Sequence, residues 1–216
     1  MDFYFAPLAC SLATRIALYE AEAPARFIYV DIHTDPSSRK LADGSDYYLV
    51  NTMGQVPAIR IPNGELLTEN AVVLQYVADT YARGILAPQD ELERYRMQSW
   101  LNFIATELHK ATYIPLLGRA NADDVKAFAR EKLALRFGHL NSHLEGRDFL
   151  LDGFSVADCY LWTVLNWSPH AGIDRAEWPA VERYFQRLGQ RASIAKAVRE
   201  EAQLYGEEMA RMKKVS

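Results

Sequence analysis

Cysteine is scarce in this sequence, with two residues, Cys10 and Cys159, in a chain of 216. Two cysteines cannot form a disulfide framework, so we expect a reducing compartment such as the cytoplasm. No window approaches the roughly 20 apolar residues that a helix needs to span a bilayer. The opening lacks a signal-peptide pattern, because residues 1–9 resemble a strand and Asp2 is acidic. We therefore expect a soluble, cytoplasmic protein that does not use a membrane.

Concentrated positive charge is also missing. Lys and Arg total 24 against 28 Asp and Glu, the net charge is −4, and the basic residues are scattered along the chain. Affinity for nucleic acid comes mainly from clustered basic charge, so we expect no nucleic-acid partner. Half of the residues are hydrophobic, which suffices for a core without disulfides. The length suits two small domains.

Residues 1–82 predict a small mixed domain of strands and helices. The order is β-α-β-α-β-β-α, with a polar stretch at 33–51 that we expect to be loop with one short helix. The first two strands flank a helix and should lie parallel. Pro62-Asn63-Gly64 predicts a hairpin turn, with positive φ at both Asn63 and Gly64. Expected strands are 3–6, 27–32, 58–61 and 66–68, and expected helices are 11–22 and 70–81.

After a linker at 83–90 the strand patterns stop. Residues 91–216 show apolar residues at helical spacing only. We therefore predict an α/β domain followed by an all-helical domain. The expected helices are 91–118 with a bend at Pro115, 122–146, 156–168, 179–191 and a charged tail helix to about 212.

Cys10 lies where the first strand gives way to the first helix. Helix N-termini favour anions and lower the pKa of a thiol. The segment Cys10-Ser11-Leu12-Ala13 stands in the place of a thioredoxin-type Cys-x-x-Cys, but it has no second sulfur. Redox chemistry at Cys10 would therefore need an external thiol. The alternative is that Cys10 is a small apolar residue buried in a corner.

Two further segments of the first domain could bind a peptide-like ligand. A cis peptide bond before Pro57 would leave the Val56 backbone free to pair with an extended peptide. An ordinary turn proline is the alternative. Glu69 and Asn70 begin a helix. The N–H groups at its start can donate to a ligand carboxylate, and the Glu69 side chain can pair with a ligand ammonium. Here the alternative is ordinary N-capping.

The long helix predicted at 91–118 carries four polar residues at i, i+4, i+7 and i+8. A polar stripe is usually solvated surface, but this one includes an imidazole that ordinarily titrates near neutrality. The four residues are Asn102, Thr106, His109 and Lys110. We keep a binding role open for them. Ser155 and Asp158 match a capping box, which we interpret as structural.

Several motifs now resemble one family in a consistent order over nearly the whole chain. They are YFAPLACSL from Tyr4, NTMGQVP from Asn51, LTEN from Leu67, WLNFIATELHK from Trp100 and FSVADCYLWTVLNW from Phe154. These segments resemble the bacterial beta class of glutathione S-transferases. The resemblance implies a thioredoxin-like domain that binds glutathione as co-substrate, an all-helical domain with a hydrophobic co-substrate pocket, no metal, and a homodimer.

The resemblance also implies roles for individual residues. Cys10, Ser11 and His109 match catalytic positions beside the glutathione sulfur. Glutathione binding is implied for Cys10, His33, Val56, Pro57, Glu69, Asn70, Asn102, Thr106 and Lys110, with Asn102 and Thr106 serving the neighbouring subunit. The co-substrate pocket is implied for Leu8, His109, Tyr113 and Trp167, although core packing is the alternative for Trp167.

The chain differs from the usual family pattern near the implied site. Leu8 stands beside the cysteine where small residues are common, and His33 stands where a lysine is common. Met53 and Asn70 also replace usual residues. The expected function is conjugation of the glutathione thiolate to small hydrophobic electrophiles, a detoxification reaction. The alternatives are disulfide reduction or reductive dehalogenation through a Cys10 mixed disulfide, and a non-catalytic binding or regulatory protein.

Overall fold

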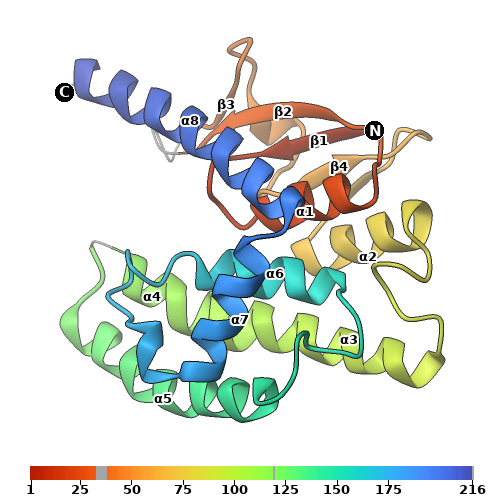
Figure 1. Cartoon of the computed structure of the whole chain (residues 1–216). Coiled ribbons are helices and arrows are strands. Elements are labelled where there is room, and N and C mark those ends of the chain that lie inside the picture. Colours follow the sequence, from red (N-terminus) through yellow and green to blue (C-terminus); the bar gives the residue numbers. More distant parts are fainter. Residues whose placement is uncertain (33–37, 119, 216) are drawn as a thin grey trace. The chain divides into compact units, whose positions relative to one another are not determined.

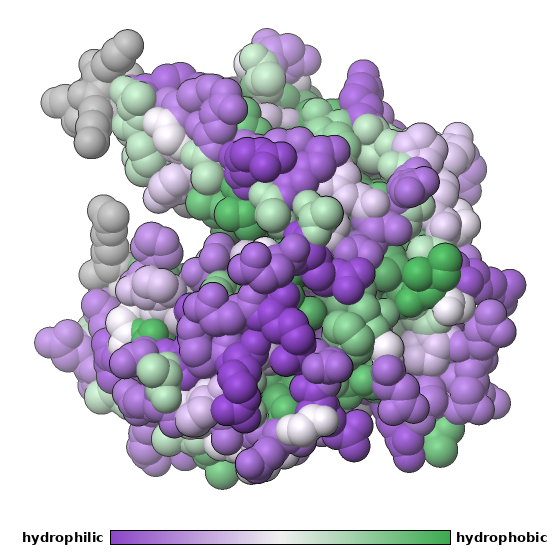
Figure 2. All heavy atoms as spheres, viewed as in Figure 1, coloured by the Kyte–Doolittle hydropathy of each residue, from purple (hydrophilic) through white to green (hydrophobic). Residues whose placement is uncertain are grey.

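The computed structural model describes residues 1–32, 38–118 and 120–215, and it divides into two compact units. Unit 1 comprises Met1–Tyr81 with Ala192–Ser216, and unit 2 comprises Ala82–Arg191. Each unit has its own hydrophobic core. Figure 2 shows that hydrophilic residues cover most of the face in view, with apolar residues interspersed among them.

Unit 1 is built on a mixed sheet of five strands in the order β3-β2-β1-β4-β5. The parallel pairing of β1 with β2 and the antiparallel hairpin of β4 and β5 are confirmed. Phe3 at the centre of β1 pairs with Phe27 on one side and Ile59 on the other. The strands are β1 (Asp2–Phe5), β2 (Arg26–Asp31), β3 (Lys40–Leu41), β4 (Ala58–Arg60) and β5 (Leu66–Thr68).

Two details of the sheet differ from expectation. β3 lies in the stretch predicted as loop, because a two-residue strand has no periodicity to recognise. The short helix expected there is the 3₁₀ turn Tyr47–Leu49. In the hairpin, Gly64 has positive φ but Asn63 does not. Ile61 pairs with Glu65 across a three-residue loop, in which only the last position needs glycine.

Helices α1 (Leu12–Glu20), α2 (Asn70–Tyr81) and α8 (Ala192–Val215) complete unit 1. α1 packs against both α2 and α8, which Figure 1 shows running beside it. The sequence predicts the tail helix as part of the helical domain. Its contacts in the structure place it in unit 1 instead, because apolar residues such as Ile194 and Ala197 on α8 are fully buried.

Unit 2 is entirely helical, as predicted, and the predicted fold class is confirmed. Its elements are α3 (Glu91–Phe103), a π-helix (Ile104–Tyr113), α4 (Ile114–Leu117), α5 (Asp123–Leu144), α6 (Val156–Leu165), a 3₁₀ turn (Arg175–Glu177) and α7 (Pro179–Gly189). The capping box of α6 is present, with Asp158 accepting from the Ser155 N–H at 2.9 Å. Among the described residues, no helix is both long and apolar enough to cross a bilayer.

Candidate functional site

Cys10 stands in the short loop between β1 and α1. Its thiol is half-buried and donates to the Val56 carbonyl at 3.1 Å. Its own carbonyl accepts the Ala13 N–H at 3.2 Å and the Asn70 side-chain amide at 3.1 Å. Cys10 therefore stands two residues before α1, at the helix N-terminus, where unpaired N–H groups favour an anion.

Ser11 lies in the loop before α1, and its hydroxyl bonds the backbone of Ala6. Its hydroxyl is fully buried, donates to the Ala6 carbonyl at 3.1 Å and accepts the Ala6 N–H at 3.2 Å. The same loop is closed by a bond from the Ala9 N–H to the Ala6 carbonyl. The catalytic role of Ser11 stays a prediction. Ser11 shapes the loop that presents Cys10.

The Val56-Pro57 peptide bond is cis, and Pro57 comes directly before β4. Both residues are buried. The preceding segment is fixed by two donors to the Gln55 carbonyl, the Asn51 amide at 2.8 Å and the Tyr47 hydroxyl at 2.9 Å. The backbone of Val56 is therefore held next to the Cys10 thiol.

Glu69 and Asn70 stand at the start of α2. Glu69 is exposed, has a φ of 65° and caps the helix through its carbonyl, which accepts the N–H groups of Val72 and Val73 at 2.9 Å. The capping is thus done by its backbone, and its carboxylate remains at the surface. Asn70 is buried, and its side chain bonds the Cys10 carbonyl and, at 3.0 Å, the Thr14 hydroxyl. Its side chain ties α2 to the loop formed by residues 6–11, which we call the cysteine loop.

Leu8 and Met53, two positions at which the sequence departs from the family pattern, belong to unit 1. Leu8 is half-buried and adopts the left-handed conformation, with a φ of 57°. Met53 is 73% exposed. His33 lies outside the described residues.

The predicted polar stripe of unit 2 is only partly present. Asn102, Thr106 and Lys110 are exposed, but His109 is 5% exposed and faces the core. The reason is the π-helix, in which the Ile114 N–H bonds the His109 carbonyl five residues back. The wider turn rotates each residue by less than an α-helix does, so His109 falls off the face that α-helical spacing assigns to it.

His109 belongs to a buried aromatic cluster. Its Nδ1 shares a hydrogen bond with the Tyr160 hydroxyl at 2.8 Å, and its ring centre lies 5.0 Å from that of Trp167. Trp167 in turn meets Tyr113 edge-on at 5.9 Å. The Tyr113 hydroxyl shares a 2.7 Å hydrogen bond with Ser168. Three residues predicted for the co-substrate pocket are therefore grouped in unit 2.

Burial changes the acid–base behaviour of this cluster. Burial, together with the smaller effect of the nearby Lys110 charge, lowers the pKa of His109 to about 3. The sequence predicts an imidazole that titrates near neutrality, and the structure corrects this, because removal from water disfavours the charged form. His109 is a neutral imidazole at physiological pH. Burial likewise raises the pKa of the Tyr113 hydroxyl.

The predicted residues therefore form two groups. Unit 1 brings together Cys10, Val56, Pro57 and Asn70, with Glu69 at the adjoining helix start, and unit 2 groups His109, Tyr113 and Trp167. Within the described part of the chain, no three His, Cys, Asp or Glu side chains are grouped so as to hold a metal ion.

Sequence reasoning missed residues that organise the cysteine loop. Arg15 on α1 and Glu201 on α8 are both buried, and an ion pair joins them. One signal was available, because Glu201 falls on the apolar face of the tail helix, seven residues after Ile194 and four after Ala197. A charged residue on a buried face needs a partner.

Two family models match the chain. The glutathione S-transferase N-terminal domain matches residues 9–80, and the glutathione S-transferase C-terminal domain matches residues 90–187. The chain is 34% identical to glutathione S-transferase GstA of Escherichia coli O157:H7 over 200 residues, which are 92% of this chain and 97% of that one.

Solved structures agree with this match. A sphingomonad glutathione S-transferase complexed with glutathione is 39% identical, with a TM-score of 0.86 over 94% of this chain and 99% of that one. A beta-class glutathione S-transferase of Sphingomonas chungbukensis is also 39% identical, with a TM-score of 0.85 over 93% and 98%. The chain belongs to the glutathione S-transferase family, and its predicted resemblance to the bacterial beta class is confirmed.

Proposed function

We propose that the chain is a glutathione transferase that joins the glutathione sulfur to small hydrophobic electrophiles, a detoxification reaction. The observation that carries this is the grouping at the start of α1, where the Cys10 thiol contacts the Val56 carbonyl and Asn70 ties in the start of α2. The relative at 39% identity that is complexed with glutathione supports the choice of ligand.

Glutathione would lie along the segment before β4. The Val56 backbone would pair with the peptide, as cis-Pro57 turns the chain into the strand. The exposed Glu69 carboxylate would bind the γ-glutamyl ammonium, and the N–H groups at the start of α2 would bind its carboxylate. Asn102, Thr106 and Lys110 are exposed polar groups available to a ligand or a neighbouring subunit, and His33 is the remaining proposed contact.

In the reaction, the glutathione thiolate would attack the electrophilic carbon. A C–S bond forms as the bond to the leaving group breaks, and the leaving group takes the electron pair. Lowering the thiol pKa from near 9 to 6–7 would be worth about 3–4 kcal/mol. The N–H groups at the start of α1 would stabilise the thiolate, and the Cys10 S–H would do so by turning from the Val56 carbonyl to the bound sulfur. In unit 2, His109, as a neutral imidazole, would act as a hydrogen-bonding group in a pocket with Tyr113 and Trp167. Leu8 in unit 1 remains a proposed contact of the co-substrate.

A second activity is favoured by the half-exposed Cys10 thiol. This thiol could attack a glutathionylated disulfide, form a mixed disulfide with glutathione and be released by a second glutathione thiolate. Such a cycle yields oxidised glutathione and the reduced substrate. Residues 1–82 would form the glutathione-binding domain, and the helices after residue 90 would supply the hydrophobic co-substrate pocket.

We also propose a homodimer that works in the cytoplasm. Leu92 and Tyr95, one turn apart on α3, are each 59% exposed and offer an apolar face for a second copy. A reducing compartment would keep the thiol of Cys10 available.

Replacing Cys10 by alanine separates the activities. In conjugation Cys10 only supports the glutathione thiolate, so Cys10→Ala should slow aryl-halide conjugation about 10-fold, near the cost of one hydrogen bond. In disulfide reduction the same change should abolish turnover and the mass gain of one glutathione. Cys159→Ala, in the buried core, is the control.

Two results would change the assignment. Complete loss of conjugation with intact glutathione binding would require a covalent mechanism centred on Cys10. Retention on glutathione resin without any turnover would favour a non-catalytic binding protein.

A further inference from the structure

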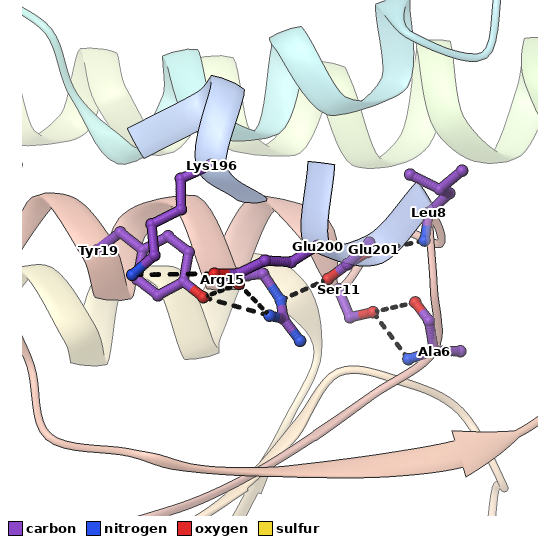
Figure 3. A network of polar contacts seen from close by, with 8 residues as sticks. All are labelled: Ala6, Leu8, Ser11, Arg15, Tyr19, Lys196, Glu200 and Glu201. Carbon is purple, nitrogen blue, oxygen red and sulfur yellow. Dashed lines mark hydrogen bonds and ion pairs between the residues drawn. The ribbon is translucent and has the colours of Figure 1, made fainter. Parts of the chain in front are cut away.

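A fully buried carboxylate reaches the cysteine loop from the far end of the chain. Glu201 on α8 accepts the Leu8 N–H through Oε2 at 2.7 Å. Its other oxygen, Oε1, forms an ion pair with Nε of Arg15 on α1 at 2.7 Å. Figure 3 shows Glu201 placed between Leu8 and Arg15. All three residues belong to unit 1.

Leu8 is the residue of this loop that most needs support. Its φ of 57° lies in the left-handed region, which costs a residue with a Cβ energy that glycine does not bear. The rest of the loop is closed on itself by Ser11 and by the bond from Ala9 to Ala6. The Leu8 N–H points away from these contacts and toward α8 (Figure 3). Cys10 follows two residues later.

Arg15 holds the carboxylate in place. Its guanidinium stacks over the rings of Phe5 and Phe27 at 4.3 and 4.4 Å, so the sheet fixes its position. Glu200, the neighbour of Glu201, pairs with the same guanidinium at 3.0 Å through Nη1 and accepts a hydrogen bond from the Tyr19 hydroxyl. The two carboxylates thus share Arg15 and differ in their contact with the cysteine loop.

We infer that Glu201 is a positioning residue, whose carboxylate holds Leu8 in the left-handed conformation and thereby sets the place of the Cys10 thiol at the start of α1. The inference deepens the proposed function, since it concerns the thiol of that same site. Any residue with a Cβ is strained at this φ, and the hydrogen bond from the Leu8 N–H to Glu201 offsets that strain.

The test measures Cys10 directly and needs no glutathione. The rate of alkylation by iodoacetamide is followed against pH, and the modified cysteine is identified by peptide mass. Glu201→Ala should move the midpoint of this profile upward by at least half a pH unit, because the thiolate loses its place at the helix start. This shift corresponds to about threefold slower alkylation at pH 7. In Glu201→Gln a single amide oxygen remains as acceptor for the Leu8 N–H and the Arg15 guanidinium. The midpoint of its profile should therefore lie between the midpoints of wild type and Glu201→Ala.

Two further variants distinguish positioning from general structural support. Glu200→Gln, the matched control, should leave the profile of Cys10 unchanged. Leu8→Gly removes the Cβ that opposes positive φ, so adding it to Glu201→Ala should restore at least half of the lost rate. If Glu201 only docked α8, Leu8→Gly would restore nothing.

The inference is overturned if Glu201→Ala and Glu201→Gln leave the profile at the wild-type position, if Glu200→Gln shifts it equally, or if Leu8→Gly gives no rescue. Should Glu201→Ala fail to fold, as judged by circular dichroism, Glu201→Gln with and without Leu8→Gly decides the question. Glutathione binding measured by calorimetry tests the proposed function separately. A shifted profile in a protein without glutathione affinity would support the positioning role and refute the function.

Discussion

The buried imidazole of His109 makes the stability of the protein depend on pH in a defined direction. Burial lowers its folded-state pKa to about 3, against 6.5 for the unfolded chain. The fold therefore favours the neutral form. The stabilisation is fully present above pH 6.5 and is lost as the pH falls toward 3, because the unfolded chain takes up a proton that the folded chain refuses. Replacing His109 by asparagine removes this proton uptake and leaves an amide that can partner Tyr160.

The magnitude follows from the two pKa values. Each pH unit below 6.5 costs about 1.36 kcal/mol, up to a limit of about 5 kcal/mol at pH 3. Between pH 8 and pH 5, His109 should therefore cost the wild type about 2 kcal/mol of its free energy of unfolding. Glu201 has the opposite sign, since burial raises its pKa to about 7. Its contribution is present at low pH, is lost as the pH rises toward 7, and cancels when wild type is compared with His109→Asn.

Urea denaturation at pH 8 and pH 5 provides the measurement. The drop in unfolding free energy should be about 2 kcal/mol larger for wild type than for His109→Asn. Tyr160→Phe is the control. It removes the hydroxyl at 2.8 Å but leaves the imidazole buried, so it should lower stability at both pH values and keep the drop. Equal drops in wild type and His109→Asn would show that the imidazole is accessible to protons and refute the reasoning.

Three further predictions concern other positions. Glu69→Ala should raise the KM for glutathione about 10–150-fold with little change in kcat, since its carboxylate would bind the end of glutathione remote from sulfur; an unchanged KM in steady-state kinetics would limit Glu69 to capping. Asp158→Ala should destabilise the protein by about 3–5 kcal/mol in denaturant titrations, because four buried donors to its oxygens lose their acceptor. Ser11→Ala should cost about 1–3 kcal/mol of stability, since both polar groups of Ala6 lose a partner; a loss of conjugation at unchanged stability would contradict this.

Features with a local signature could be predicted from the sequence. The parallel pair β1–β2, the hairpin β4–β5 and the capping box of α6 each depend on residues close together in the chain. Their periodicity and turn residues are enough to specify them. β3 could not be found in this way, because it has two residues and joins the sheet through its pairing with β2, which no local periodicity announces.

The burial of His109 shows a different limit. Helical spacing places it with Asn102 and Thr106 on one face, and that argument assumes a constant α-helical rotation. The π-helix breaks the assumption over Ile104–Tyr113, and nothing in the polar and apolar pattern announces the wider turn. The residue that was expected at a solvated face is therefore in the core, and its predicted titration near neutrality was wrong for the same reason.

The cysteine loop shows why a site is harder to predict than a fold. Its position is fixed by contacts with Val56, Asn70 and Glu201, which are separated from their partners in the loop by 46, 60 and 193 residues. The first two contacts come from segments whose local motifs already stand out. The third comes from a tail helix whose pattern reports only amphipathicity, and no spacing along the chain links it to Leu8. Since a left-handed leucine needs that contact more than a glycine would, the residue that departs from the family pattern and the carboxylate that supports it have to be understood together.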